Sequence, residues 1–212
     1  MRDSKENDEF RYCSDWIHEL ESKEHWTLYW KQQELIQSYA NKNDKILEVG
    51  IGTGFTAAYL RHKGFDVTTA DIDKEKNPDI HTNIVTAELD ADFDIILAFE
   101  IFEHLPFKYL ESTLSLLKRN CRKCLIFSVP EFYQSFISFS LRLPIIRRFS
   151  FNIPRPRFLP EPKLAEYHHW EVNSQRQSRL KELKIIFSNI EMIVDHHELF
   201  LDRHFFVLKS GH

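Results

Sequence analysis

Apolar positions recur at two different spacings along the chain, and the spacing separates predicted helices from predicted strands. The segments Asp8–Glu21 and Lys23–Tyr39 place apolar and aromatic residues at helical spacing, as amphipathic helices do. Short apolar runs follow, of which Lys45–Val49 and Ile95–Phe99 are typical of strands buried on both faces. Residues 1–41 are therefore expected to form two helices that precede a sheet.

Strands and helices are predicted to alternate from Lys45 onward. The expected strands are Lys45–Val49, Phe65–Ala70, Ile80–Val85, Ile95–Phe99 and Lys123–Val129, and the expected helices are Thr53–Lys63 and Lys108–Lys118. Gly64 stands where a helix C-terminus favours glycine, and Pro130 closes the last of these strands. This alternation predicts an α/β fold with a parallel sheet.

Residues 131–170 interrupt the alternation. This stretch holds five prolines and many phenylalanines, together with the arginines Arg142, Arg147, Arg148, Arg155 and Arg157. It is predicted to be a lid inserted between the fifth strand and the last helix, Ser174–Phe187. The runs Ile190–His197 and His204–Lys209 then predict a final hairpin. The arginines are expected to form a solvated rim; the alternatives are a clasp for a phosphate or carboxylate, or contact with RNA or an anionic membrane.

Composition narrows the class of protein. With 212 residues, 42% apolar and 28% charged, the chain fits one soluble domain. A net charge of −4 argues against a duplex-DNA binder. We expect a cytoplasmic protein, because neither a signal peptide nor an apolar run of membrane-spanning length is visible. Cys121 and Cys124 form a C-x-x-C without a second pair, which argues against structural zinc.

A glycine-rich turn is the strongest chemical signal. Gly50, Gly52 and Gly54 follow the first predicted strand and precede a helix, so the backbone can approach a nucleotide closely. The dinucleotide fingerprint G-x-G-x-x-G fails because Phe55 occupies its third glycine position. An acid, Asp71, ends the second strand about 20 residues further on, where a carboxylate can bind ribose hydroxyls.

Two motifs resemble those of class I S-adenosylmethionine-dependent methyltransferases. The E-x-G-x-G-x-G of Glu48–Gly54 resembles motif I, and Asp94–Pro106 is similar to the F-D-x-x-x-x-x-E-x-x-E-H-L-P stretch of the type 11 group. The H-x-W-E of His168–Glu171 and the closing Arg203–Lys209 resemble a bacterial subgroup. The resemblance implies a Rossmann-like, seven-stranded, mostly parallel sheet with an antiparallel last strand. A single domain would then comprise N-terminal helices (1–41), a cofactor-binding half (45–130), the lid (131–170), and a C-terminal helix and hairpin (171–212).

The same resemblance implies S-adenosylmethionine as cofactor and assigns residues to it. Glu48 would lie near the methionine ammonium, Asp71 would bind the ribose, and Phe99 would border the sulfonium. Asn83 and Ile84 are the candidates for the adenine, with Asp79 a weaker one. The full cofactor set is Glu48, Gly50, Gly52, Gly54, Asp71, Asn83, Ile84 and Phe99.

Two histidines are candidates for the base that removes the acceptor's proton. His104 follows the fourth strand and His168 ends the lid, and an imidazole titrates in the required range. Each is otherwise a capping or scaffold histidine. The site is expected to hold no metal ion; the alternative is a divalent ion bound by Glu100, Glu103 and His104.

The predicted function is methyl transfer from S-adenosylmethionine to an oxygen or nitrogen of a small molecule. Three alternatives remain: a non-catalytic S-adenosylmethionine-binding protein, an RNA methyltransferase, and an NAD-dependent oxidoreductase. The sequence carries no Asn/Asp-Pro-Pro-Tyr motif, which disfavours base aminomethylation.

Overall fold

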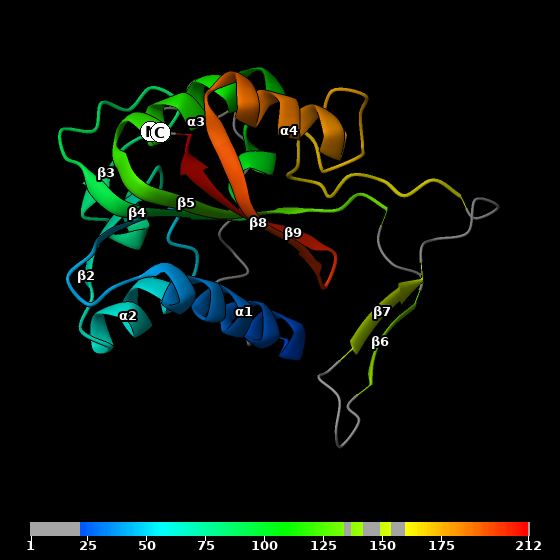
Figure 1. Cartoon of the computed structure of the whole chain (residues 1–212), viewed down its shortest axis with the longest axis horizontal. Coiled ribbons are helices and arrows are strands. Elements are labelled where there is room, and N and C mark those ends of the chain that lie inside the picture. The colour runs from blue at the N-terminus through cyan, green and yellow to red at the C-terminus, as the bar shows by residue number, and fades with distance from the viewer. Residues whose placement is uncertain (1–21, 134–136, 142–148, 154–159, 212) are drawn as a thin grey trace.

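A computed structural model describes residues 22–133, 137–141, 149–153 and 160–211. The predicted helix Asp8–Glu21 and the five arginines of the insertion lie outside these ranges. Within them, a seven-stranded sheet forms the centre of the molecule (Figure 1). Its strands are β1 (Lys45–Val49), β2 (Asp66–Asp71), β3 (Ile80–His81), β4 (Phe93–Phe99), β5 (Cys121–Pro130), β8 (Met192–Phe200) and β9 (Arg203–Ser210).

The strand order is β3-β2-β1-β4-β5-β9-β8. Neighbours from β3 to β5 are parallel, whereas β9 runs antiparallel to both β5 and β8. The predicted seven-stranded sheet with an antiparallel last strand is therefore confirmed. The chain moves outward from β1 to β3 and then returns to β4 on the other side of β1. Such a reversal opens a crevice at the carboxyl ends of the strands, where α/β proteins bind ligands.

Helices cover both faces of the sheet. Helices α1 (Lys23–Tyr39) and α2 (Phe55–His62) pack on one face, and α3 (Leu110–Arg119) and α4 (Leu180–Asn189) on the other (Figure 1). Each face has its own buried apolar cluster, because side chains of a strand alternate between its two sides. The central strands β1, β4 and β5 are apolar on both faces, as their unbroken apolar runs predict.

Two boundaries differ from the prediction by more than three residues. The third strand ends at His81 rather than Val85, because the next residues form a turn in which the side-chain Oδ1 of Asn83 accepts from the backbone N–H of Val85 at 3.0 Å. Helix α4 starts at Leu180 rather than Ser174. The Oγ of Ser178 donates to the carbonyl oxygen of Glu171 at 2.8 Å, which holds the preceding segment in a turn.

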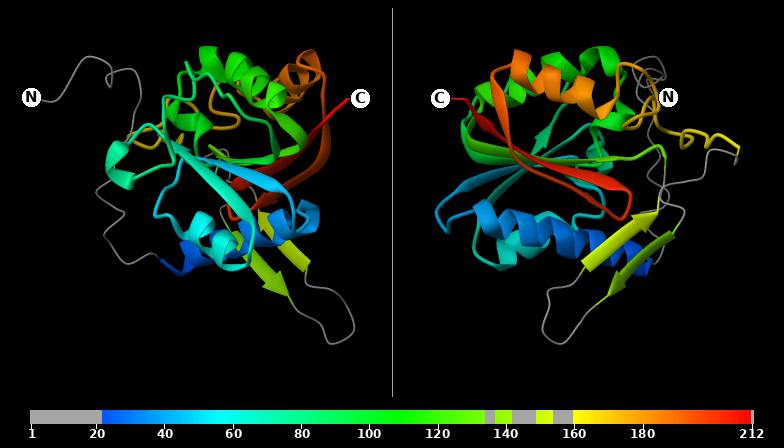
Figure 2. Two further views of the ribbon diagram at one scale, coloured as in Figure 1. Left: turned by 90° about the vertical axis from the view of Figure 1, so that its left-hand side faces the viewer. Right: turned by 45° about the vertical axis from the view of Figure 1, so that its right-hand side comes forward.

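The predicted lid contains a hairpin that the sequence did not reveal. Strands β6 (Ile137–Leu141) and β7 (Phe149–Ile153) pair antiparallel and form a separate two-stranded sheet. This hairpin stands apart from the central sheet in all three views (Figures 1 and 2). The chain then returns to the central sheet, where Glu131 and Val172 form an isolated bridge.

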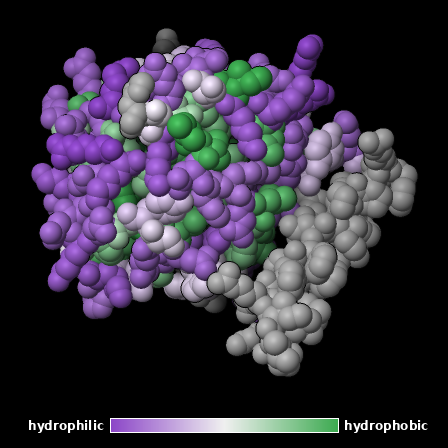
Figure 3. Space-filling view, in the orientation of Figure 1, coloured by the Kyte–Doolittle hydropathy of each residue, from purple (hydrophilic) through white to green (hydrophobic). Residues whose placement is uncertain are grey.

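The surface is mostly hydrophilic. The face in Figure 3 shows apolar residues only in small, separate patches. Within the described ranges, no helix combines the length and apolar character needed to cross a bilayer.

Trp170 anchors the return of the insertion to the core. It is 1% exposed, its indole Nε1 donates to the carbonyl oxygen of Leu105 at 3.1 Å, and its ring meets the edge of Phe107. Trp170→Ala is expected to lower the free energy of unfolding by about 3–5 kcal/mol, because it leaves a large cavity. Urea denaturation measures this loss. Trp30→Ala, at a site 55% exposed, is the matched control and should change stability by less than about 0.5 kcal/mol. Equal losses in the two variants would contradict this role.

Candidate functional site

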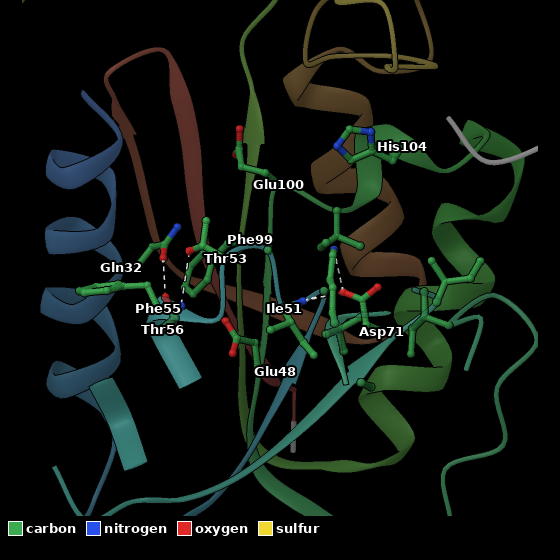
Figure 4. A pocket seen from close by; sticks show the side chains of 18 of the residues that line it. Gln32, Glu48, Ile51, Thr53, Phe55, Thr56, Asp71, Phe99, Glu100 and His104 are labelled. Atoms are coloured by element: carbon green, nitrogen blue, oxygen red, sulfur yellow. Dashed lines mark hydrogen bonds and ion pairs between the residues drawn. The ribbon is translucent and has the colours of Figure 1, made fainter. Parts of the chain in front are cut away.

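A cavity of about 450 Å³ opens at the carboxyl ends of β1, β2 and β4. Figure 4 shows it from close by, with Glu48 and Asp71 toward one end and His104 toward the other. The structure brings most of the predicted residues to its wall: Glu48, Gly50, Gly52, Asp71, Asn83, Ile84, Phe99, His104 and His168. Gly54 is not part of the wall; it caps the start of α2 instead.

The glycine turn borders the cavity, and two of its lining positions, Gly50 and Gly52, carry no side chain. Gly50 has a φ of +78°, a conformation that L side chains rarely adopt, and its N–H donates to the carbonyl oxygen of Ala70 at 2.8 Å. A Cβ at this position would lie 1.9 Å from the Cδ1 of Ile101. Gly54 also has a positive φ, of +80°. The turn is therefore closed to larger residues at Gly50 for reasons of both strain and space.

Glu48 is a buried acid at the base of the cavity. Only 4% of the residue is exposed, and its Oε2 has no hydrogen-bond partner among the described residues. Burial raises the pKa of Glu48 to about 8, and the nearby charge of Asp71 adds to this; the backbone of Ala57 and the charge of Arg61 act in the opposite direction. A cationic group in the cavity would satisfy this carboxylate and favour its ionised form.

Asp71 ties the glycine turn to the end of β2. Its Oδ2 accepts from the backbone N–H of Ile51 at 2.8 Å, and its Oδ1 accepts from the backbone N–H of Asp73 at 2.8 Å. Lys76 pairs with the same Oδ2 at 3.1 Å, and both side chains are buried. The sequence analysis missed Lys76, which also lines the cavity. Its proximity to Asp71 along the chain, on the short 3-10 turn Lys74–Lys76, was the available signal.

The residues predicted to contact the adenine follow β3. Asn83 and Ile84 line the cavity, and Ile84 is 7% exposed. The Oδ1 of Asn83 already accepts the bond from Val85, so one of its two lone pairs remains for a ligand. Asp79 does not line the cavity. It binds the backbone N–H of Thr69 and the guanidinium of Arg61.

Helix α1 supplies a cavity wall that the sequence analysis did not predict. The Tyr29 hydroxyl lies 3.0 Å from the Oγ1 of Thr53, and the hydroxyl of Thr56 donates to the Oε1 of Gln32 at 3.0 Å. The rings of Tyr29 and Phe55 stack with centroids 4.7 Å apart. These contacts fasten α1 to the glycine turn and the start of α2 (Figure 4).

Phe99 and Glu100 end β4 at the cavity. Glu100 has a φ of +53°, and its two carboxylate oxygens accept from the hydroxyl of Ser128 and the Nε of Arg203, each at 2.7 Å. The candidate ion set Glu100, Glu103 and His104 is therefore not assembled. Instead, the structure gathers Glu103 and His104 with His168, with one potential ligand atom from each residue within 4.8 Å of the others.

The two candidate bases meet although they lie far apart in sequence. The rings of His104 and His168 are perpendicular, with centroids 4.9 Å apart. The Nδ1 of His104 lies 2.9 Å from the carbonyl oxygen of Tyr167, and the Nδ1 of His168 lies 2.7 Å from the Oε1 of Glu171. Because both partners only accept, each histidine donates through Nδ1, which leaves the one acceptor lone pair of a neutral ring at Nε2.

A comparison with protein families identifies the fold's relatives. The model of a methyltransferase domain matches residues 8–178, well over half of the chain. The chain belongs to this family. The predicted class I methyltransferase is thereby confirmed, and no curated protein sequence matches the chain significantly.

Solved structures share the methyltransferase fold at low sequence identity. The PH0226 protein of Pyrococcus horikoshii OT3 is 12% identical, with a TM-score of 0.59 over 92% of this chain and 95% of that one. The glycopeptide N-methyltransferase MtfA, complexed with S-adenosylhomocysteine, is 11% identical, with a TM-score of 0.56 over 85% and 88%. Magnesium protoporphyrin IX methyltransferase from Synechocystis PCC 6803, with bound S-adenosylmethionine, is 12% identical, with a TM-score of 0.56 over 88% and 79%.

The C-x-x-C of this methyltransferase is not a reactive pair. Both cysteines are free and lie on β5, and burial raises the pKa of Cys121 to about 11 and of Cys124 to about 12. Thiols with such pKa values remain protonated and do not readily bind metals or attack disulfides.

A comparison of two glycine variants separates the backbone strain at Gly50 from the lack of space for a side chain there. Gly64→Ala carries the cost of a φ of +87° alone, because a Cβ there meets nothing within 4 Å. Its free energy of unfolding is expected to fall by about 1–2 kcal/mol. Gly50→Ala adds the overlap with Ile101 and is expected to lose about 1–3 kcal/mol more. Urea denaturation of the two variants measures the difference, and equal losses would mean that the turn has room for a side chain.

Proposed function

We propose that this protein transfers a methyl group from S-adenosylmethionine to an oxygen or nitrogen of a small-molecule acceptor. The observation that carries the proposal is the pair of buried carboxylates, Glu48 and Asp71, on either side of a bare backbone turn within one cavity. The Oε2 of Glu48 lacks a hydrogen-bond partner among the described residues, and Asp71 holds the turn in place through the backbone N–H of Ile51.

The residues present fit this donor. The Glu48 carboxylate would hold the ammonium of the methionine part, and Asp71 would hold the ribose hydroxyls with its remaining lone pairs. Gly50 and Gly52 present backbone to the cavity, and Asn83 with Ile84 would border the adenine. When bound, S-adenosylmethionine supplies an electrophilic methyl group on a sulfonium. The solved relatives bound to this compound or its product support the assignment.

His104 lies at the opposite end of the cavity from Glu48 (Figure 4), and His168 lies beside it, so we assign both to the acceptor. A neutral imidazole there accepts the proton that an O–H or N–H acceptor loses as its new bond to carbon forms. The carboxylate of Glu171 holds the ring of His168 in place and offsets the positive charge that this ring gains. Such a base contributes a factor of about 10²–10⁴, and the larger share of the rate comes from holding the reactants in line.

The walls of the cavity support the proposal of a small acceptor. Helix α1 closes one side through Tyr29 and Gln32, and the end of the insertion closes another through Tyr167 and His168. A cavity of about 450 Å³ has the size of small-molecule sites. This enclosure favours a small acceptor over a folded RNA or protein surface.

Removal of the Asp71 charge tests the donor site. Asp71→Asn keeps the shape of the side chain and is expected to weaken S-adenosylhomocysteine binding at least about tenfold, because charge-assisted ribose contacts are lost. Asp66→Asn, at the exposed start of the same strand, removes the same charge and should leave affinity unchanged. Titration calorimetry measures both. An affinity of Asp71→Asn equal to that of the unmodified protein would refute the ribose role.

The reaction itself is tested with a panel of small phenols, carboxylates and amines. Release of S-adenosylhomocysteine above the acceptor-free background is expected for at least one class, and it should fall in parallel with donor affinity in Asp71→Asn. Tight donor binding without turnover on any acceptor would instead support a binding protein without catalytic function.

The protonation of Glu48 predicts a pH dependence of donor binding. With a pKa of about 8 in the free protein, Glu48 is mostly protonated at neutral pH and must ionise to hold an ammonium. Affinity for S-adenosylhomocysteine is therefore expected to rise with pH between about 6 and 8, by up to about tenfold per pH unit. Glu48→Gln should abolish the slope. Adenosine, which lacks the ammonium, is the control ligand, and a similar slope for adenosine would assign the titration to another group.

A further inference from the structure

Glu103 is an acid without an evident purpose in the fold. It lies on the 3-10 turn Phe102–His104, is fully buried, and neither carboxylate oxygen has a hydrogen-bond partner among the residues described. Its backbone carbonyl accepts from the N–H of His169 at 2.8 Å, which ties this turn to the end of the insertion. A buried carboxyl group that gains no hydrogen bond lowers stability, so its presence calls for a ligand.

Two histidines converge on this carboxylate from different parts of the chain. A carboxylate oxygen of Glu103 and one ring nitrogen each of His104 and His168 lie within 4.8 Å of one another. Both histidines line the cavity, whereas Glu103 lies fully buried. Two neutral imidazoles and one carboxylate form a mixed nitrogen and oxygen ligand set that suits borderline divalent ions.

We propose that Glu103, His104 and His168 bind one divalent ion of the Zn²⁺ class at the acceptor end of the cavity. Ligand atoms on a tetrahedral Zn²⁺ lie about 3.3 Å apart, given bonds of about 2.0–2.1 Å. Side-chain rotations that bring the three ligand atoms from within 4.8 Å to this spacing complete the set. Three protein ligands leave a further coordination position, as in catalytic rather than structural zinc sites.

The surroundings of the histidines match those of metal ligands. Histidines that bind metals commonly donate their other ring N–H to a carboxylate or a backbone carbonyl, which fixes the ring and its tautomer. His168 does so with Glu171, whose side chain is 9% exposed, and His104 does so with the carbonyl of Tyr167. Glu171 itself is held by a bond from the backbone N–H of Ala165 at 3.4 Å.

Electrostatics explains why Glu103, and not Glu100, completes the set. The two carboxylate oxygens of Glu100 accept hydrogen bonds from Ser128 and Arg203, so this carboxylate already has an ion-pair partner. Burial, helped by the charge of Glu100, raises the pKa of Glu103 well above its usual range, and the opposing effect of Arg203 is smaller. A bound divalent ion would act against this rise, because its charge favours the ionised carboxylate.

The remaining coordination position faces the cavity, because both histidines line it. An acceptor that offers an oxygen or nitrogen lone pair would occupy this position, and an acceptor O–H bound there loses its proton more easily. This consequence rests on the proposed function, whereas the ion site itself does not. With an ion bound, the histidines serve as its ligands and the proton passes to water.

The test uses the full chain, freed of ions with a chelator and titrated with Zn²⁺ by calorimetry. One ion per chain is expected. Co²⁺ should give the visible absorption of a low-coordinate nitrogen and oxygen site. Mg²⁺ should not compete, because it prefers oxygen ligands.

The variants separate this site from adventitious binding by surface histidines. Glu103→Gln preserves the packing and is expected to weaken Zn²⁺ binding at least about tenfold. His168→Ala should weaken binding at least as much, and Glu171→Gln by about 10–100-fold through its effect on the ring of His168. His62→Ala, which removes a histidine from the exposed end of α2, is the matched control and should bind as the unmodified protein does.

Two results would overturn the ion site: no binding of one Zn²⁺ per chain, or binding that survives unchanged in both Glu103→Gln and His168→Ala. S-adenosylhomocysteine affinity, measured on the same samples, distinguishes the two proposals. Intact donor binding without Zn²⁺ binding rejects the ion site alone. If the unmodified protein does not bind S-adenosylhomocysteine, the proposed function is rejected. The Zn²⁺ titration of the same samples then still decides whether the ion site exists.

Discussion

The bond from the backbone N–H of Ile51 to the carboxylate of Asp71 is the constraint on which the cavity depends. It joins the turn after β1 to the end of β2, two strands that pair in parallel with Val49 opposite Ala70. Gly50 adds a second bond to β2 through its N–H. With both bonds made, the turn is held against the end of β2, and α2 starts at a fixed place beside it. The shape of the cavity floor follows from these two bonds and from the absence of a side chain at Gly50.

Two buried acids, Glu48 and Glu103, have oxygens without hydrogen-bond partners among the described residues. A fold selected for stability alone would replace them with apolar residues, because burying a carboxyl group without compensation is unfavourable. Burial raises the pKa of both carboxyl groups and so favours their protonated forms. A cation bound beside either group would favour the ionised form instead. Glu48 suits an organic ammonium, since the backbone turn beside it leaves room for a large ligand. Glu103 suits a bare ion, since two imidazoles approach it closely.

The sequence predicted the sheet and the donor end of the cavity because their signals are local. The apolar runs of β1, β4 and β5 mark strands, and the motif of Glu48–Gly54 lies within seven consecutive residues. Asp71 is only 20 positions from Ile51. By contrast, the α1 wall depends on pairs such as Tyr29 with Thr53, 24 positions apart, for which no motif exists. The start of α4 was predicted too early because side-chain bonds of Ser178 compete with helix formation, and the β6–β7 hairpin was not predicted.

The end of the cavity that holds His104 and His168 was harder still to predict from local sequence signals. His104 and Tyr167 are 63 positions apart, and only the return of the insertion, fastened by Trp170 under Leu105, brings them together. The sequence placed Glu100 with Glu103 and His104 because they are neighbours in the motif, but the backbone of Glu100 turns at a φ of +53° and its side chain pairs with Arg203, 103 positions away. A long-range ion pair thus removes one acid from the site, and a long-range loop supplies a histidine in its place. The end of the cavity with Glu48 and Asp71 is consequently encoded within a short stretch of chain, whereas the end with His104 depends on how the insertion returns to the sheet.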